Sequence, residues 1–300
     1  MKIAVTTPTG HIGSKVTDIL LERGVKVILL SRYPDKVQHF AERGAEVLQG
    51  SLENGGFVSR ATRGVDAMFW LTPPNPTATD LRGFQNACGR AAVQAIRTND
   101  IPRIVNLSSF GAQFGTGVGP IKGLHDVENL LDEAAANVTH LRCGYFFENY
   151  LSQVEHLKRD ASIYLPVSGR RRVPMIATAD IARAAAERLL DNEWTGRNVC
   201  GLHGPRDLAF DEAAEAMSRG VGYTVRHLRV GEAAARLAMK AMGASDGVIE
   251  TLLEMYRAMD SGLLVPAEPR TRDTTTPTTL EQFARNAIMP LVAVPAGAHL

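Results

Sequence analysis

The stretch KIAVTTPTGHIG, residues 2–13, decides the fold class. Its first part, Lys2–Thr6, has the β-branched and apolar residues typical of a buried strand. A turn with two glycines follows, and Ser14–Arg23 continues as a helix with its apolar residues on one face, ending at Gly24. A strand that passes through a short glycine-containing turn into a helix is typical of the first half of a β-α-β unit.

The same alternation continues through the first half of the chain. Strands are expected at Val25–Leu30, Ala45–Leu48, Asp66–Leu71, Arg103–Leu107 and Val138–Arg142, with helices at Asp35–Arg43, Gly56–Thr62, Thr79–Thr98 and Lys122–Glu133. Strands that alternate with helices form parallel sheets through right-handed crossovers. The sequence therefore predicts an α/β fold, with a Rossmann-type doubly wound parallel sheet formed by residues 1–150.

The pattern changes after Gly144, and residues 151–300 are predicted to form a smaller, mostly helical C-terminal lobe that binds a substrate. Within residues 178–204, a helix at Ala179–Leu190 and a strand at Asn198–Leu202 are expected to rejoin the sheet. The remaining expectations are a helix at Tyr145–Lys158, a basic loop at Arg170–Arg172, a strand within Tyr223–Val230 and a loop at Thr271–Thr279. The tail, Ala287–Leu300, receives no assignment.

Composition restricts the possible partners of the chain. Hydrophobic residues make up 45%, enough for a large core, and 33 basic against 32 acidic residues leave a net charge of +1. Such a balance provides no broad basic surface for nucleic acid or an anionic membrane. We therefore expect a small-molecule partner, and the protein itself is expected to be a monomer or a homodimer. A cytoplasmic location is expected because no leader or membrane-spanning pattern is present.

The three cysteines, Cys88, Cys143 and Cys200, are far apart in the chain. Their spacing indicates neither a disulfide framework nor a metal site, so buried thiols are expected and no metal is assigned.

The turn after the first strand is a candidate dinucleotide site. A helix N-terminus favours anions, Gly10 would let a pyrophosphate approach the backbone, and Gly13 would let the helix pack closely on the strand. The candidate contacts with the cofactor are Thr7, Thr9, Gly10, His11 and Ile12. The alternative is an ordinary strand–helix turn.

The end of the second strand discriminates between the two nicotinamide cofactors. NAD sites usually place an acid there, whereas an arginine accommodates the 2′-phosphate of NADP. Here Ser31 is followed by Arg32, and Lys36 lies one helical turn further on. NADP(H) is therefore preferred over NAD(H), unless both cations are ordinary surface charges.

The chain resembles the NmrA-like branch of the atypical short-chain dehydrogenase/reductase superfamily. The resemblance extends along nearly the whole chain, through the glycine turn, Ser31–Lys36, Val65–Ala67, Leu71–Pro74, Arg103–Ser109, His125-x-x-Glu128, Leu141–Asn149, Ala179–Ala182 and Gly204-Pro205. It implies a Rossmann core with a C-terminal lobe and an NAD(P) cofactor across the strand ends. It also implies that Leu71, Thr72 and Pro73 contact the ribose or nicotinamide, and that Ser108 and Ser109 lie beneath the nicotinamide.

Two positions depart from the family pattern. Thr7 replaces the usual first glycine of the turn, and Gly50-Ser51-Leu52 stands where the family often has an aspartate near the adenine. Both departures indicate an adjusted nucleotide site.

The usual catalytic pair of the superfamily is missing. Ser109 matches the catalytic serine, but none of the six tyrosines is followed four residues later by lysine. Lys122, His125 and Glu128 share one side of the expected helix instead. His125 could donate a proton near neutral pH, and Lys122 could bind the ribose or act as the acid. Alternatively, His125 packs beneath the cofactor and Glu128 stabilises the helix.

A substrate wall is expected just after the sixth strand, where Tyr145, Phe146 and Asn149 would suit a flat, apolar acceptor such as a quinone. Core packing is the alternative for these aromatic residues. Core packing is also the preferred interpretation for four methionines on the expected C-terminal helices, although they could instead line an apolar pocket: Met239, Met242, Met255 and Met259. Arg170–Arg172 is expected to be a solvated loop rather than an anion site.

Together these features predict an NADPH-dependent oxidoreductase. It would transfer a hydride to a small aromatic or unsaturated carbonyl or quinone-type compound without the Tyr-x-x-x-Lys relay. The alternatives are a non-catalytic, NADP(H)-binding redox-sensing regulator, and a non-redox enzyme that uses the cofactor structurally.

Overall fold

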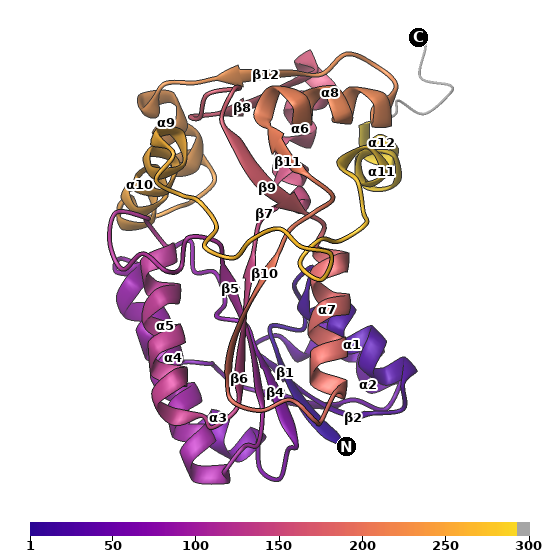
Figure 1. The fold of residues 1–300 in the computed structure, drawn as a ribbon, viewed down its shortest axis with the longest axis vertical. Helices are drawn as coiled ribbons and strands as arrows, with labels where there is room; N and C mark the ends of the chain where they lie inside the picture. The colour runs from indigo at the N-terminus through magenta and orange to yellow at the C-terminus, as the bar shows by residue number, and fades with distance from the viewer. Residues whose placement is uncertain (293–300) are drawn as a thin grey trace.

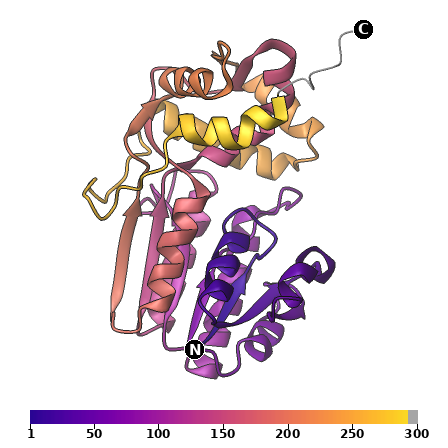
Figure 2. The ribbon, with the colours of Figure 1, turned by 90° about the vertical axis from the view of Figure 1, so that its right-hand side faces the viewer.

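A computed structural model describes residues 1–292 and shows a parallel sheet with a second layer of structure above its carboxyl ends (Figures 1 and 2). The sheet has seven strands in the order β10-β6-β5-β4-β1-β2-β3. Their bounds are β1 (Lys2–Thr6), β2 (Lys26–Ser31), β3 (Glu46–Gln49), β4 (Ala67–Trp70), β5 (Ile104–Ser109), β6 (Val138–Cys143) and β10 (Arg197–Leu202). All pairings within this sheet are parallel, so the Rossmann-type sheet predicted from the sequence is confirmed.

Helices cover both faces of the sheet (Figure 1). One face packs on α1 (Gly13–Glu22), α2 (Gln38–Ala41) and α7 (Thr178–Leu190), and the other on α3 (Gly55–Ala61), α4 (Leu81–Asn99) and α5 (Ile121–Ala134). The alternation of side chains along β1 explains this arrangement. Ile3 and Val5 pack in the core on the side of α1 and α7, and Ala4 packs in the core on the side of α3, α4 and α5. A strand buried on both faces carries a continuous apolar run, as residues 2–13 indicated.

The strand order reverses at β1, which pairs with β2 on one side and β4 on the other. The chain after β1 enters α1 on one face of the sheet and the chain after β4 enters α4 on the other face, so the loops after β1 and β4 diverge. In open α/β sheets this divergence leaves a crevice at the carboxyl ends of the strands, where ligands bind.

Two expected helices differ from the structure. The segment after β2 forms a 3-10 turn (Pro34–Val37) before the short α2. The prediction of one helix over Tyr145–Lys158 was wrong at its start. Tyr145–Phe146 forms strand β7, followed by a 3-10 helix (Phe147–Gln153) and α6 (Val154–Asp160). Tyr145 and Phe146 are extended because they pair with Met175 and Ile176, a contact across 30 residues that local periodicity does not reveal.

The second layer contains two small sheets and helices packed around a separate core (Figure 2). β7 and β11 (Asp207–Ala209) flank β9 (Arg172–Ile176), and β8 (Ser162–Leu165) pairs with β12 (Arg226–Arg229). Arg172 therefore begins a strand, which corrects the expectation of a loop over Arg170–Arg172. The helices are α8 (Phe210–Val221), α9 (Glu232–Ala241), α10 (Asp246–Ser261), α11 (Leu280–Phe283) and α12 (Met289–Val292), with a π-helical turn at Ala284–Ile288.

Residues 264–279, named here the strap, cross in front of β10 between α10 and α11 (Figure 1). The strap is tied to the end of β10, because the His203 N–H donates to the Thr274 carbonyl at 2.8 Å and the Thr276 N–H donates to the His203 carbonyl at 2.8 Å. Thr278 is bound to Asp180 at the start of α7 through its N–H and its hydroxyl. The strap therefore attaches the lobe to the sheet.

The three cysteines are free, and Cys88 and Cys143 are buried. Burial raises the pKa of the Cys88 thiol to about 12.

Within residues 1–292, no helix combines the length and the hydrophobicity needed to cross a bilayer. Of the unassigned tail, Ala287–Val292 continues the last helical turns, and residues 293–300 lie outside the described part.

Candidate active site

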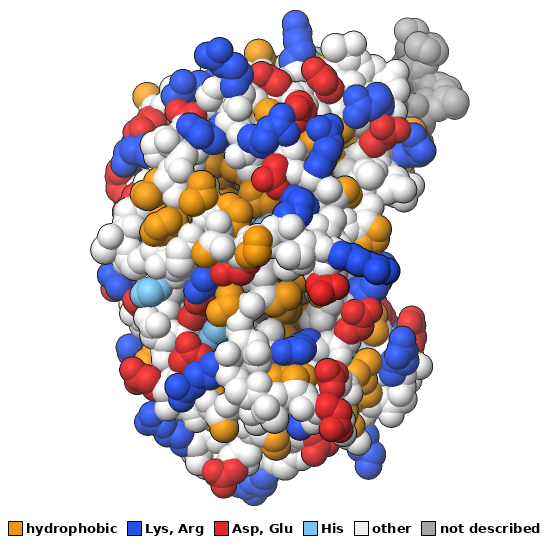
Figure 3. All heavy atoms as spheres, in the orientation of Figure 1, with side chains coloured by type: hydrophobic (Ala, Val, Ile, Leu, Met, Phe, Trp, Pro, Cys, Tyr) orange, Lys and Arg blue, Asp and Glu red, His pale blue; other side chains and the backbone are white. Residues whose placement is uncertain are grey.

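A cavity of about 1410 Å³ lies between the carboxyl ends of the central strands and the lobe. Its lining begins at the turn after β1, continues past the ends of β4, β5 and β6, and reaches α6, α9 and α10 in the lobe. Hydrophobic side chains gather across the middle of this side of the molecule, between the more charged ends (Figure 3). Sites for drug-sized ligands usually measure about 300–1,000 Å³, so this cavity has room for more than one such molecule.

The turn after β1 has the backbone geometry expected of a nucleotide site. Thr7 has a φ of +51°, in the left-handed region that favours glycine, and its carbonyl accepts the Gly10 N–H at 3.1 Å. A Cβ at Gly13 would lie 2.3 Å from the Thr7 carbonyl oxygen, so only glycine lets α1 start this close to the turn. The first turn of α1 has no acidic residue that would compete with an anion.

Thr7 therefore takes a strained backbone conformation that glycine adopts more easily, which costs on the order of 1 kcal/mol. Its hydroxyl donates to the Thr6 carbonyl at 2.8 Å. Of the predicted turn contacts, Thr7, Gly10, His11 and Ile12 line the cavity, whereas Thr9 is exposed and is not part of the lining.

The ends of β4 and β5 contribute two hydroxyl groups to the same cavity. The loop after β4 is fixed by Thr6, whose hydroxyl oxygen accepts the Leu71 N–H at 2.8 Å. Leu71, Thr72 and Pro73 line the cavity, as do Ser108 and Ser109. The buried hydroxyls of Thr72 and Ser108 have no hydrogen-bond partner among residues 1–292. Buried polar groups are normally satisfied, so these two oxygens indicate positions where a ligand supplies the partner.

Arg32 and Lys36 lie at the end of β2, outside the cavity lining. Both are exposed and flank the ring of Tyr33, with the Arg32 Cζ 5.6 Å and the Lys36 Nζ 4.9 Å from the ring centroid. Neither forms an ion pair with any described residue. Their charges are therefore available to a phosphate beside the β1 turn.

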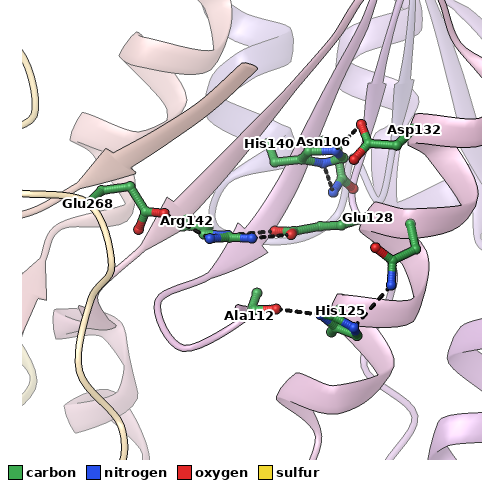
Figure 4. A network of polar contacts seen from close by, with 9 residues as sticks. Asn106, Ala112, His125, Glu128, Asp132, His140, Arg142 and Glu268 are labelled. Carbon is green, nitrogen blue, oxygen red and sulfur yellow. Dashed lines mark hydrogen bonds and ion pairs between the residues drawn. The ribbon is translucent and has the colours of Figure 1, made fainter. Parts of the chain in front are cut away.

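Lys122 and His125 do not reach the cavity, although their helix α5 lines it through Ile121 and Leu124. The His125 Nδ1 lies 2.7 Å from the Ala112 carbonyl oxygen, and the Nε2 lies 3.0 Å from the Asn129 amide nitrogen (Figure 4). Because a carbonyl only accepts, Nδ1 carries the proton and Nε2 accepts from Asn129. Both ring nitrogens are thus occupied.

Lys122 lies 3.5 Å from the carboxylate of Glu254. Ser109 does line the cavity, and its hydroxyl donates to the Phe110 carbonyl at 3.1 Å. The structure therefore brings Ser109 to the cavity but not Lys122 or His125.

Glu128 belongs to a buried ionic cluster that joins α5, β6 and the strap (Figure 4). The guanidinium of Arg142 donates to both carboxylate oxygens of Glu128, at 3.0 and 2.6 Å, and to Glu268 at 2.8 Å. Burial alone would lower the pKa of Arg142, but the hydrogen bonds and charges of the two carboxylates outweigh this effect and raise it. Glu128 therefore fixes the position of its helix, as the structural interpretation of this residue proposed.

The residues after β6 serve both the cavity and the lobe core. Tyr145, Phe146 and Asn149 line the cavity. Tyr145 also packs edge-on against Tyr150 and Phe210, with ring centroids 5.8 and 5.6 Å apart, and its burial raises its pKa. Core packing therefore describes Tyr145, which also faces the cavity, and the substrate wall stays a prediction.

The opposite wall comes from α9 and α10, and it includes all four late methionines: Met239, Met242, Met255 and Met259. Met239 and Met259 are also buried in core clusters and Met255 packs against one, as the preferred interpretation of core packing expected, so these side chains contribute both to the core and to the cavity lining. Their spacing of three or four residues on two helices was the available signal.

Another group of lining residues gave no sequence signal: Gln153, His156, Arg159, Tyr164 and Tyr256. Arg171 and Arg172, by contrast, are bound within the lobe, to the Asp260 carbonyl and to Glu212 respectively. Among the described residues, no group of three or more His, Cys, Asp or Glu side chains is placed to hold a metal ion.

Comparisons with known proteins agree with this geometry. The chain is 27% identical over 254 residues to an NAD(P)H azoreductase from Xenophilus azovorans, covering 85% of this chain and 86% of that protein. Its fold is similar to a crystal structure of a nucleoside-diphosphate-sugar epimerase from Staphylococcus aureus (TM-score 0.81, 20% identity, 95% and 100% of the two chains covered). It is also similar to an NADPH-dependent quinone oxidoreductase from Escherichia coli complexed with NADPH (TM-score 0.78, 22% identity, 94% and 98% covered).

A model of the NmrA-like family matches residues 1–284. With the glycine turn, the strand order and the cavity at the switch point, this match shows that the chain belongs to the NmrA-like family.

Proposed function

We propose that this protein is an NADPH-dependent oxidoreductase that transfers a hydride to a small aromatic or unsaturated carbonyl or quinone-type acceptor. The observation that carries the proposal is the single continuous cavity, which joins the β1 turn to an aromatic and methionine-rich wall. Such a cavity has a place for a nucleotide at one end and for a flat apolar molecule at the other. The azoreductase and the quinone oxidoreductase named above support this reaction class.

The residues of the sheet end fit a dinucleotide. Three observations fit: only glycine is accommodated at position 13, the hydroxyls of Thr72 and Ser108 lack a partner among residues 1–292, and Arg32 and Lys36 form no ion pair within that range. Thr7, Gly10, His11 and Ile12 would hold the phosphates, while Arg32 and Lys36 would bind the 2′-phosphate and select NADPH over NADH. When bound, NADPH supplies the hydride, and the protein supplies binding and orientation.

The chain is proposed to divide its work between two regions. Residues 1–150, together with residues 178–204, would bind the cofactor. The rest of residues 151–300 would form the wall that contacts the acceptor. Tyr145, Phe146 and Asn149 would bind the acceptor and exclude water. With Lys122 and His125 directed elsewhere, water or the acceptor itself is the proposed source of the proton. We propose a cytoplasmic protein with a small-molecule substrate; both a monomer and a homodimer are compatible with this site.

The test is to mix purified protein with NADPH and a panel of quinones, enones and azo compounds, and to follow the near-ultraviolet absorbance of NADPH. Loss of absorbance with a quinone, and slower loss with NADH, is the expected result. NADPH binding without its oxidation by any acceptor would instead support a redox-sensing regulator. The large apolar cavity argues against that alternative, because a regulator needs no site for an acceptor. Acceptor conversion without NADPH consumption would indicate a non-redox enzyme.

A further inference from the structure

The lobe end of the cavity has a polar cluster in an otherwise apolar wall. Gln153, His156, Arg159 and Tyr164 line the cavity there, on the 3-10 helix, α6 and β8. Arg159 is the one lysine or arginine among the described residues of the lining. A lone guanidinium in such a wall has no role in apolar packing or in the proposed cofactor site at the opposite end.

The guanidinium of Arg159 is fixed by its neighbours. Its Nε and Nη2 donate to one carboxylate oxygen of Asp160, at 3.1 and 2.9 Å, and Nη2 also donates to the His156 Nδ1 at 2.8 Å. The Tyr164 hydroxyl donates to the same carboxylate oxygen at 3.0 Å. These bonds orient the guanidinium before any ligand arrives, which lowers the entropic cost of binding.

The cluster keeps two donors beyond those that the Asp160 carboxylate engages. Since a guanidinium only donates, the His156 Nδ1 accepts and its proton lies on Nε2. The Arg159 Nη1 and the His156 Nε2 then remain as donors without a partner among residues 1–292. Glu148, the one carboxylate in the described lining, is already bound to the Thr178 N–H and hydroxyl. Asp160 lies outside the lining; its Oδ2 accepts from Arg159 and Tyr164, whereas its Oδ1 is buried and has no partner among residues 1–292.

We propose that Arg159, with His156, binds an anionic oxygen group on the acceptor, so that the preferred substrates are aromatic acceptors with a sulfonate or carboxylate substituent. The ring system would lie against Tyr145 and the methionines, and the anionic group would face the cluster. The inference rests on the proposed function. It adds a specificity determinant in the lobe to a cofactor site on the sheet.

The experiment compares two acceptors with the same ring system, 1,2-naphthoquinone and 1,2-naphthoquinone-4-sulfonate, and follows how each variant changes the ratio of their kcat/KM values relative to the parent protein. Arg159→Gln is expected to lower kcat/KM for the sulfonate about tenfold, mainly through KM, because one charge-assisted contact is lost. Arg159→Lys should keep part of the preference, since it retains the charge but not the planar donor pair. The values for the neutral quinone and the NADPH affinity should stay unchanged.

The matched control is Arg219→Gln. Like Arg159, Arg219 is an exposed arginine in an ion pair with a carboxylate, but it lies outside the cavity lining. Equal losses for both quinones in Arg159→Gln would show a structural role and overturn the proposal. Weaker NADPH binding with unchanged selectivity would assign Arg159 to the cofactor instead. No change for either quinone would also overturn it.

A binding measurement separates this inference from the proposed function. Naphthalene-2-sulfonate cannot accept a hydride in this way, and its fluorescence reports its binding to the protein. If neither quinone is reduced but the sulfonate binds and Arg159→Gln weakens that binding, the proposed reaction fails and the anion site stands. If the quinones are reduced and the sulfonate shows no dependence on Arg159, the anion site fails and the reaction stands.

Discussion

The two ends of the cavity are built in different ways. The sheet end consists of short segments directly after β1, β4 and β5, and its geometry depends on backbone requirements such as the glycine at position 13. The lobe end consists of side chains from α6, β8, α9 and α10, which only the tertiary structure brings together. The difference teaches that the proposed cofactor site follows local sequence, whereas the proposed acceptor site depends on long-range packing. The predictions below test the junction that joins the sheet to the lobe and the independence of the two ends.

The largest effect is expected at the buried cluster that joins the sheet to the strap. Glu128→Ala would leave Arg142 with a weaker set of partners in a buried site, and we expect the free energy of unfolding to fall by about 3–5 kcal/mol. Urea unfolding of the parent and the variant measures this difference in the free energy of unfolding. The control is Glu254→Ala, which removes the 3.5 Å pair with Lys122 and should cost about 0–1 kcal/mol. Equal small losses for both variants would contradict the importance of this junction.

The next effect concerns the sheet end alone. Arg32→Ala should weaken NADPH binding by about 10- to 100-fold, because a charged hydrogen bond contributes about 1.5–3 kcal/mol. NADH affinity and the KM for the acceptor should not change, since NADH has no 2′-phosphate. Fluorescence titration checks both cofactors, with Arg23→Ala, near the other end of α1, as the control. An Arg32→Ala protein that binds NADPH like the parent would remove the basis for the cofactor preference.

A pH effect is expected where the strap meets β10. His203 is buried, and neither ring nitrogen has a partner among the described residues. Burial, with the charge of Arg270, lowers the pKa of His203 below its usual value of 6.5, although Asp207 and Glu268 act in the opposite direction. The unfolded chain therefore binds the proton more readily than the folded one. This contribution to stability is complete above about pH 6.5 and decreases as the pH falls below it.

The parent should lose at most about 1.4 kcal/mol per pH unit from this group, measured by urea unfolding between about pH 7.5 and about pH 5.5. His203→Gln should lack this part of the slope. The exposed His39 provides the control, because His39→Gln should keep the slope of the parent. Identical slopes in all three proteins would show that His203 does not titrate in this range.

The smallest effect concerns the lobe end. Met242 lines the cavity and is 70% exposed, so Met242→Ala should raise the KM for a neutral quinone only about threefold, with a contribution below about 1 kcal/mol. NADPH affinity should not change. Met289→Ala, an exposed methionine outside the cavity, serves as the control. A change in NADPH affinity with Met242→Ala would show that the two ends are coupled.

How far the sequence predicts this protein depends on the range of the interactions. The strands β1 to β6 and β10 lie within a few residues of their predicted positions, because their apolar runs and the intervening helices follow local periodicity. The helix expected at Tyr145 was wrong because pairing with Met175 decides that segment. Lys122 and His125 share the expected helix, yet Glu254 and Ala112 determine where they point.

The sequence by itself determined the doubly wound sheet, the glycine turn with Thr7 in place of glycine, the cations after the second strand and the absence of a Tyr-x-x-x-Lys pair. These features depend on backbone geometry and on residues adjacent in the chain. Only the tertiary structure decided that Glu128 binds Arg142 and the strap, that the methionines face the cavity, and that Arg159 is its sole lysine or arginine within the described lining. Such contacts join residues that are far apart in the chain, and a local sequence pattern does not predict which partner a side chain contacts.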